Sequence, residues 1–388
     1  VDKGQLTAMM FLDLSSAFDT VDHAHMLSIL RRRFSVESPA LDWFQSYLSN
    51  RTQTFTVGES KSDPCLVYCS VPQGSVLGPV QFNAYTEDVV ELFDHNKVNH
   101  HLYADDQQMY THIDSGSEAA GLKRLTDCFS DLSNWCASRR LRLNASKTEL
   151  IWFGSRTMIR HMADENRSIT FCSTVLQSVD VVRNLGVLFD SELTMKQHIN
   201  HVVSVGYYHL RRLRQIRRHV TRDALKQLAS ALVLSRIDYC NSTLIGLPAC
   251  TIAPLQRLQN AAARLVMGLR ARDHVTSTLA ELHWLPVRFR ISFKVSLIMF
   301  LIRSHQCPAY LSNIVTPLNS EPSRRRLRSS TGTDYLIPRT KTKFGERSFS
   351  VAGPTTWNAL PESVRAAADV ATFKRLLKTH YFESAFML

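Results

Sequence analysis

The chain has 388 residues, of which 44% are hydrophobic and 21% are charged, and it carries a formal net charge of +12. This composition excludes a disordered chain and is typical of a globular protein with two or three domains. The eight cysteines are irregularly spaced, which excludes a disulfide scaffold and favours buried thiols over a zinc site.

Strands and helices alternate in the first half of the sequence. Strand patterns occupy residues 7–14, 51–57 and 66–70, and helical periodicity occupies residues 22–33, 41–50 and 117–137. A loop with Gly and Pro over residues 71–79 opens a helix that we expect to run through about Phe93. A hairpin at 101–110 and a strand within 140–154 complete the pattern. We predict an α+β fold, with an antiparallel split βαβ sheet and helices on one face.

After about residue 192 the pattern becomes helical. We expect helices at 195–220, 222–235, 253–269 and 287–305. In the first of these, an apolar stripe should face neighbouring helices: Leu210, Leu213, Ile216 and Val220. Arginines fill its outer faces: Arg211, Arg212, Arg214, Arg217 and Arg218. A second basic cluster, residues 324–328, lies in a Ser- and Pro-rich stretch that is typical of a linker.

The charge is unevenly distributed along the chain. Residues 1–110 carry 7 Lys and Arg against 14 Asp and Glu, whereas residues 111–388 carry 39 against 20. This asymmetry predicts a cation site next to a surface for polyanions, of which nucleic acid is the obvious one. A basic surface that is merely solvated is the alternative.

Two adjacent carboxylates, Asp105 and Asp106, stand at the turn of the hairpin. An Asp-Asp pair at a hairpin tip is common, because Asp side chains bond their own backbone there. Asp13, however, ends the first strand, and the three carboxylates would meet if the sheet places that strand beside the hairpin. Carboxylates held together repel unless a divalent cation lies between them. Such a site suits two Mg²⁺ ions, the arrangement that polymerases use.

Five ordered motifs resemble the reverse transcriptases of non-long-terminal-repeat retrotransposons of the LINE class, in the jockey-like and chicken-repeat-like group. The motifs are FLDLSSAFDTVDH, VPQGSVLGP, YADD, LNASKTELIWFGS and VRNLGVLFD. Downstream phrases such as ELHWLPVRFRISFK are also similar to that group. The resemblance implies a reverse-transcriptase palm over residues 1–192, a helical thumb over 193–270 and a helical C-terminal region over 271–388.

The resemblance also implies roles for single residues near the carboxylates. Asp13, Asp105 and Asp106 would hold two Mg²⁺ ions, or Mn²⁺ in their place, with the backbone of Leu14 as an extra ligand. Lys147 would lie near the triphosphate, where it neutralises charge or donates a proton to the leaving pyrophosphate. A lysine that is only solvated is the alternative.

Three further groups of residues are implied to contact substrates. Phe18 would place its ring under the sugar of the incoming nucleotide, the alternative being a core Phe. Gln73 and Gly74 would pack on the template strand and the nucleotide, and Leu185 and Gly186 would grip the primer end. The five arginines named above would lie along the template and primer duplex.

The function implied is RNA-directed DNA polymerisation, with an RNA template, a DNA primer and deoxynucleoside triphosphates as partners. We expect an intracellular protein of the nucleus or cytoplasm with no membrane partner, because the longest apolar run, residues 295–302, is too short to span a bilayer. The oligomeric state is left open. The alternatives are a nucleic-acid-binding remnant without catalysis and, more weakly, a two-metal nuclease.

Departures from the family pattern support the remnant. The chain begins with Val, after the position of the family's fingers region, and we expect it to be a segment of a longer protein. The family's endonuclease and its Cys and His knuckle are also absent from the sequence. Gln81 and Thr86 stand where apolar or small residues are expected, as in a decayed copy.

Overall fold

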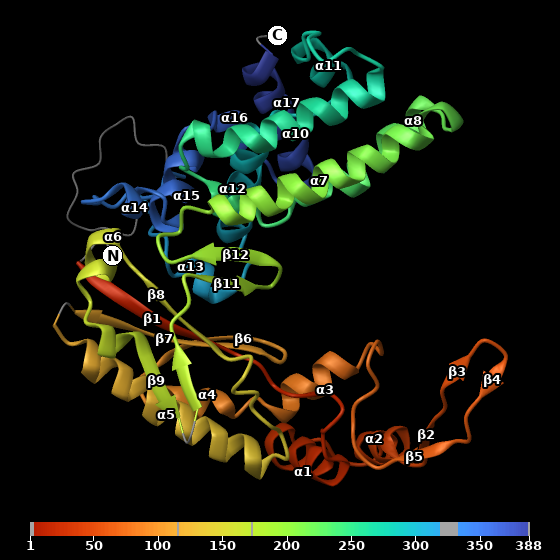
Figure 1. The fold of residues 1–388 in the computed structure, drawn as a ribbon, viewed down its shortest axis with the longest axis vertical. Coiled ribbons are helices and arrows are strands. Elements are labelled where there is room, and N and C mark those ends of the chain that lie inside the picture. The colour runs from red at the N-terminus through yellow and green to blue at the C-terminus, as the bar shows by residue number, and fades with distance from the viewer. Residues whose placement is uncertain (1–3, 115, 172–173, 319–332, 387–388) are drawn as a thin grey trace. The chain divides into compact units, whose positions relative to one another are not determined.

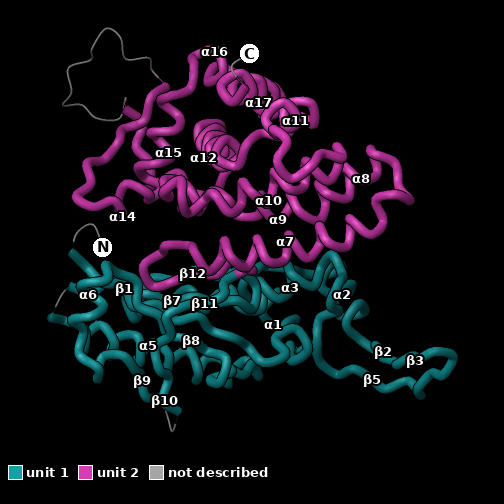
Figure 2. Tube along the Cα trace, turned by 45° about the horizontal axis from the view of Figure 1, so that its top comes forward, with its two compact units in different colours: residues 1, 3–184 teal, residues 2, 185–388 magenta. Residues whose placement is uncertain are grey.

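The computed structural model describes residues 4–114, 116–171, 174–318 and 333–386, and Figure 1 shows their fold. The basic cluster expected at 324–328 lies outside these residues. The chain forms two compact units, and the boundary between them lies between Asn184 and Leu185. Figure 2 shows the two units in different colours. The three-part division at residues 192 and 270 stays a prediction.

The first unit, residues 4–184, is built on a four-stranded antiparallel sheet. Its strands follow the order β6-β7-β1-β8, with bounds β6 (Asn99–Tyr103), β7 (Asp106–Asp114), β1 (Gln5–Leu12) and β8 (Glu149–Phe153). Burial alternates along β1, so that its even-numbered residues face the core and its odd-numbered residues are half-buried. This alternation is expected for a sheet covered by helices on one face. The α+β prediction is confirmed.

The helices of this unit pack on the sheet and on one another. They are α1 (His23–Phe34), α2 (Ala40–Leu48), α3 (Gly78–Tyr85), α4 (Val89–His95), α5 (Glu118–Ser138) and α6 (Arg156–His161). Helix α1 begins at Asp22, whose Oδ1 accepts a hydrogen bond of 2.7 Å from the N–H of His25, as an N-cap carboxylate does. In α5, Leu125, Phe129 and Leu132 are fully buried in the unit's core.

The helix expected to run through Phe93 is interrupted, which corrects the sequence-based prediction. Helix α3 ends at Tyr85 and α4 begins at Val89. The Thr86 hydroxyl donates a hydrogen bond of 3.0 Å to the carbonyl of Phe82, one turn back. Side-chain bonds of this kind compete with the helical backbone pattern, and periodicity in the sequence does not reveal them.

The strand expected over residues 51–57 is divided into two short strands. β2 (Arg51–Gln53) pairs with β5 (Cys65–Val67), and β3 (Thr56–Val57) pairs with β4 (Ser60–Lys61). The unit ends with a 3-10 turn and three short strands: η1 (Asp164–Arg167), β9 (Ser168–Phe171), β10 (Thr174–Gln177) and β11 (Val181–Asn184).

The second unit, residues 185–386, is almost entirely helical after β12 (Val187–Asp190). Its first part contains α7 (Lys196–Ile216), η2 (Arg217–His219), α8 (Arg222–Ala229), the π-helix η3 (Ser230–Leu234), α9 (Ser235–Asp238), η4 (Asn241–Leu244) and α10 (Ala249–Met267). Helices α7 and α10 approach closely at Gly206, where a Cβ would lie 2.4 Å from Leu258 Cδ2. Glycine is required there because any side chain would collide with α10.

The remaining helices of this unit build a further core around aromatic rings. They are α11 (Thr276–Glu281), α12 (Val287–Arg303), α13 (Ala309–Ser312), α14 (Lys343–Glu346), α15 (Phe349–Asn358), α16 (Glu362–Arg365) and α17 (Val370–Phe386). Phe300 stacks on Phe373 with ring centroids 4.2 Å apart, and both lie in the cluster that contains Trp357. No helix in the described part of the chain has the length and apolar character needed to cross a membrane.

Candidate active site

The sheet register brings the predicted carboxylates to one edge. Leu12 at the end of β1 lies opposite Gln107 of β7, and Tyr103 of β6 lies opposite Asp106. Asp13 therefore follows β1 at the same edge where the β6–β7 turn carries Asp105 and Asp106. The expectation that the first strand lies beside the hairpin is confirmed.

The turn itself has a strained backbone. Only two residues, Ala104 and Asp105, connect the paired residues Tyr103 and Asp106. Ala104 has φ 53°, a left-handed conformation that glycine adopts more readily than alanine. Backbone strain of this kind concentrates at functional sites, where the surrounding structure holds it in place.

The three carboxylates interact electrostatically. Desolvation raises the pKa of Asp106 above its usual value, and the negative charges of Asp105 and Asp13 raise it further. Charges that raise the pKa of Asp106 in this way lie near it. The repulsion between them favours any cation that the site can admit.

Lys147 supplies a positive charge at this edge. Its Nζ lies 3.4 Å from Oδ2 of Asp13, although two thirds of the lysine side chain is exposed. The backbone fixes this approach, because the N–H of Asn144 donates to the Asp13 carbonyl at 2.8 Å and the N–H of Lys147 donates to the Asn144 carbonyl at 3.1 Å. Lys147 is thus paired with a site carboxylate rather than only solvated.

Phe18 lies between the core and the surface. Its ring is half-buried and stacks on the fully buried ring of Phe82, with centroids 4.6 Å apart and planes 20° from parallel. Its backbone carbonyl accepts a hydrogen bond of 2.9 Å from the N–H of Val71, the first residue of the predicted loop. The structure thus places Phe18 against the loop that contains Gln73 and Gly74.

The loop is held by a contact that sequence reasoning missed. Nε2 of Gln73 donates a hydrogen bond to Oδ1 of Asp19 at 3.0 Å. The one sequence signal for this contact was that Asp19 directly follows Phe18. Gly74 has φ +80°, and a Cβ there would meet no atom within 4 Å. Its glycine is therefore required by the backbone conformation, and the space beside it is open to a ligand. Ser75 closes the loop by donating to the Pro72 carbonyl at 2.7 Å and accepting from the Gly78 N–H at 2.9 Å.

Comparison with known proteins identifies the first half of the chain. The model of the reverse transcriptase (RNA-dependent DNA polymerase) family matches residues 1–189. This segment is therefore similar to the reverse-transcriptase family. The match spans both the carboxylate edge and the loop at Gly74.

The curated relatives that this chain matches come from mobile elements. The chain is 28% identical over 210 residues to a probable RNA-directed DNA polymerase from transposon BS of Drosophila melanogaster, covering 53% of this chain and 22% of the relative. It is 29% identical over 198 residues to the RNA-directed DNA polymerase from mobile element jockey of the same species, covering 50% and 20%. The chain thus spans about a fifth of the length of these relatives. The resemblance to non-LTR retrotransposon enzymes is confirmed.

A solved structure of telomerase from Candida albicans, in complex with a fragment of telomeric RNA, is also similar. The similarity covers 71% of this chain and 49% of that one, with 11% identity and a TM-score of 0.32. At this level of similarity it carries no argument about this chain.

Reverse transcriptases use divalent metal ions, and the residues at the carboxylate edge have the chemistry to hold them. Oδ2 of Asp13 is buried and has no hydrogen-bond partner among the described residues, and its ion pair with Lys147 at 3.4 Å shows that it attracts a cation. In the described part of the chain, however, no three His, Cys, Asp or Glu side chains are grouped to hold a metal ion. The three aspartates therefore share one edge of the sheet without being grouped as a ligand cluster.

Leu14 contributes its backbone next to Asp13. It forms an isolated bridge with Leu143, in which the bonds run from Asn144 N–H to the Asp13 carbonyl and from Ser15 N–H to the Arg142 carbonyl. These two bonds do not use the carbonyl of Leu14. That carbonyl is therefore outside the bridge, as its proposed role as a metal ligand requires.

Leu185 and Gly186 form a tight turn at the start of the second unit. Both have positive φ, 45° and 82°, and they precede β12. The Tyr239 hydroxyl donates a hydrogen bond of 2.6 Å to the Leu185 carbonyl and fixes the turn. Sequence reasoning missed Tyr239, because nothing in the local pattern links the two segments.

The arginines of the predicted basic helix are exposed, all five of them: Arg211, Arg212, Arg214, Arg217 and Arg218. In the apolar stripe, Leu210 and Leu213 are buried and Val220 is half-buried, but Ile216 is 40% exposed, which corrects the expectation. Ile216 is the last residue of α7, and the tighter turn of η2 that follows no longer has the spacing that keeps one face inward.

Arg217 differs from the other arginines of this helix. A Cβ at Gly268 would lie 2.3 Å from Nη2 of Arg217, so the guanidinium rests directly on this residue. Gly268 is the C-cap of α10, where the helix dipole favours a cation. Arg217 therefore has a structural contact that competes with its expected role toward nucleic acid.

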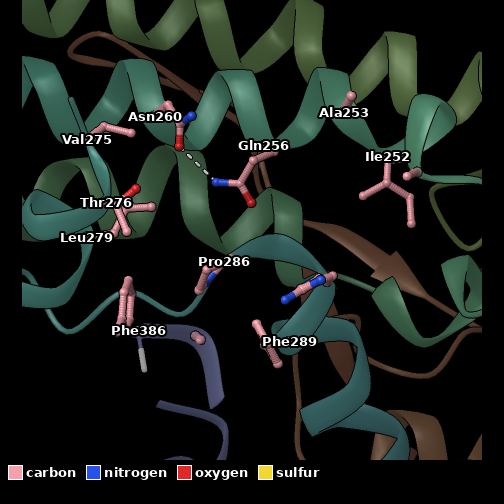
Figure 3. A pocket seen from close by; sticks show the side chains of 13 residues that line it. Ile252, Ala253, Gln256, Asn260, Val275, Thr276, Leu279, Pro286, Phe289 and Phe386 are labelled. Carbon is pink, nitrogen blue, oxygen red and sulfur yellow. Dashed lines mark hydrogen bonds between the residues drawn. The ribbon is translucent and has the colours of Figure 1, made fainter. Parts of the chain in front are cut away.

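A cavity of about 470 Å³ in the second unit has no part in this chemistry. Figure 3 shows its lining, which includes Ile252, Leu279, Pro286, Phe289 and Phe386. Gln256 is bound within the wall, where its Nε2 donates to Oδ1 of Asn260 at 2.8 Å and its Oε1 accepts from the Val287 N–H at 2.8 Å. The lining contains neither Asp nor Glu.

Proposed function

We propose that this protein catalyses RNA-directed DNA synthesis at the edge formed by Asp13, Asp105 and Asp106. The observation that supports the proposal is the sheet register, in which the strand that ends before Asp13 pairs with the hairpin that carries Asp105 and Asp106, in a segment that matches the reverse-transcriptase family model. In the reaction we infer, the 3′-oxygen of a DNA primer bonds to the α-phosphorus of a deoxynucleoside triphosphate. The bond between the α-phosphorus and pyrophosphate breaks, and the hydroxyl proton passes to solvent water.

The carboxylates would hold two Mg²⁺ ions, with Mn²⁺ as a substitute, and the Leu14 carbonyl would complete their coordination. Such ions, when bound, supply Lewis-acid stabilisation to the attacking and leaving oxygens. Lys147 pairs with Asp13, and its exposed side chain could turn to a triphosphate instead. There it neutralises the charge that develops on pyrophosphate or donates a proton to it.

The half-buried ring of Phe18 would lie under the nucleotide sugar, where its bulk excludes a 2′-hydroxyl. Gln73 and Gly74 would contact the template strand and the nucleotide, and the open space beside Gly74 supports this role. In the second unit, the turn at Leu185 and Gly186 would hold the primer end. The exposed arginines 211, 212, 214 and 218 would contact the phosphates of the duplex, with Arg217 sharing its charge with α10.

A primer-extension assay with an RNA template tests the proposal. Asp106→Asn should lower the extension rate by a factor of about a hundred or more, because it removes one charge that acts on the reacting centre. Asp94→Asn is the matched control, because Asp94 is an exposed carboxylate of α4 outside the site. Equal activity of the two variants would place the chemistry elsewhere.

A second candidate function is nucleic-acid binding without catalysis. It is favoured by the buried amide of Gln81, which has no hydrogen-bond partner among the described residues and is out of place in a well-adapted core. The test is to incubate the wild-type protein with a duplex of primer and RNA template in Mg²⁺ or Mn²⁺. Binding of the duplex without extension of the primer would support this alternative.

A further inference from the structure

A second, smaller cavity in the helical unit differs sharply from the apolar one. Its volume is about 290 Å³, and its lining carries two lysines from different helices, Lys294 of α12 and Lys378 of α17. His283, Arg290 and Asp238 also line it. Ionisable side chains thus converge here from segments far apart in the sequence.

The charges around this cavity do not cancel. Its lining contains one carboxylate, Asp238, and that carboxylate is already bound by Arg290, whose Nε donates to Oδ1 at 2.8 Å and whose Nη2 donates to Oδ2 at 2.5 Å. A paired carboxylate offers little compensation to further cations. Lys294 and Lys378 are both exposed, and they add two positive charges to the cavity without a carboxylate of the lining left to pair with them, so an anion in the cavity would meet both charges.

A buried acceptor adds a second requirement. Asn241 lines the same cavity and is only 2% exposed, and its Oδ1 has no hydrogen-bond partner in the described part of the chain. Its Nδ2 donates to Asp238 at 3.4 Å, so the network is tied to the Arg290 pair. An unsatisfied buried acceptor costs about 1–3 kcal/mol, which a hydroxyl donor from a ligand would recover.

We propose that this cavity binds a phosphate-bearing ribonucleotide unit. Lys294 and Lys378 would contact the phosphate, and a sugar hydroxyl would donate to Asn241. The ring of Phe293, which also lines the cavity, offers an apolar surface for the sugar or base. The same chemistry is presented by an RNA chain and by a free ribonucleotide. The proposal goes beyond the polymerase activity and does not depend on it, because it concerns binding alone.

The test is a titration of the full chain with a short single-stranded RNA, the DNA of the same sequence, and a ribonucleoside monophosphate. The double variant Lys294→Ala/Lys378→Ala should weaken RNA binding about tenfold and flatten its salt dependence by about 1.4 units of logarithmic slope, at about 0.7 per phosphate contact in a single strand. The control is Lys343→Ala/Lys374→Ala, which removes the same charge at two exposed lysines that do not line the cavity. Its slope should stay close to that of the wild type.

The possible results distinguish a free ribonucleotide from an RNA chain as the ligand, and they also show whether the cavity binds either one. If the monophosphate binds the wild type and binds the cavity variant more weakly, a free ribonucleotide is enough to occupy the site. If only the RNA oligomer loses affinity, the ligand is an RNA chain. Both results support the site. Asn241→Leu should reduce the preference for RNA over DNA, provided that circular dichroism shows the wild-type helical content. Equal losses in the cavity variant and in the lysine control would overturn the proposal. Because no extension is measured, an inactive polymerase leaves this test unaffected.

Discussion

Replacing Gln81 should make the reverse-transcriptase domain more stable. Gln81 lies in α3 next to the buried Phe82 and is 2% exposed, and neither its Nε2 nor its Oε1 has a hydrogen-bond partner among the described residues. Each unsatisfied buried polar group costs about 1–3 kcal/mol. Gln81→Leu removes both groups and keeps a side chain of similar length, so we expect a gain of about 2 kcal/mol after some loss from imperfect packing.

The assay must report on the first unit, because a chain with two units need not unfold in one step. Hydrogen exchange of α3 and of the neighbouring core, measured by mass spectrometry across a urea series, meets this need. A gain of about 2 kcal/mol corresponds to a rise of roughly 4–8 °C in the melting temperature of a unit of this size. Gln45→Leu is the control, since Gln45 is an exposed residue of α2 and its replacement should change stability by less than about 0.5 kcal/mol.

A loss of stability in Gln81→Leu would refute this reasoning. It would mean that the Gln81 amide has a partner in solution, so that the substitution removes a hydrogen bond instead of two unpaired groups. A gain in stability combined with retained extension activity would show that the amide is a defect of packing that the enzyme tolerates. The prediction thus bears on the difference between a working polymerase and a decayed one.

Two further predictions concern Phe18 and His25. Phe18→Ala should raise ribonucleotide incorporation in the extension assay and lower the unfolding free energy by roughly 2 kcal/mol, because the ring also stacks on Phe82; unchanged sugar selectivity would leave it a packing role alone. Burial lowers the pKa of His25 below the ordinary 6.5, which means that the folded protein favours the neutral ring. The contribution of His25 to the unfolding free energy is therefore fully present above pH 6.5 and is lost as the pH falls through the lowered pKa. The unfolding free energy of His25→Leu should therefore decrease less than that of the wild type between about pH 7.5 and about pH 5. Equal decreases in the two proteins would exclude His25 as a source of acid sensitivity.

The strands and helices were largely readable from periodicity, but their interruptions were not. The alternating pattern of β1 and the long repeats of α5 and α10 reflect burial against a core, which the sequence encodes directly. The break at Thr86 depends on one hydroxyl that turns back to a carbonyl. The exposure of Ile216 depends on where α7 tightens into η2, and helix ends are the least predictable part of a helix.

The carboxylate edge was predictable because each aspartate lies at or close to the end of a strand. The sequence could not supply the register, since a shift by one residue would move every side chain of β1 to the other face. The residues that anchor the two proposed substrate loops could not be predicted from the sequence either. Asp19 holds Gln73 and Tyr239 holds Leu185, and each pair is separated by 54 positions in the chain. Contacts at such separation follow from the fold and leave no local pattern.

The basic helix gives a prediction in which the structure separates one arginine from its neighbours. Contacts to duplex phosphates each contribute about 0.9 units to the logarithmic salt slope, so replacing Arg211, Arg214 and Arg218 together by Ala should flatten the slope by about 2.7. The loss should be the same for all duplex sequences, because phosphates carry no sequence information. Arg217→Ala should instead lower thermal stability, with little change in slope, because its guanidinium rests on Gly268 at the C-terminus of α10. Fluorescence anisotropy at several salt concentrations measures the slopes, and a triple variant that keeps the wild-type slope would assign these arginines to a solvated face.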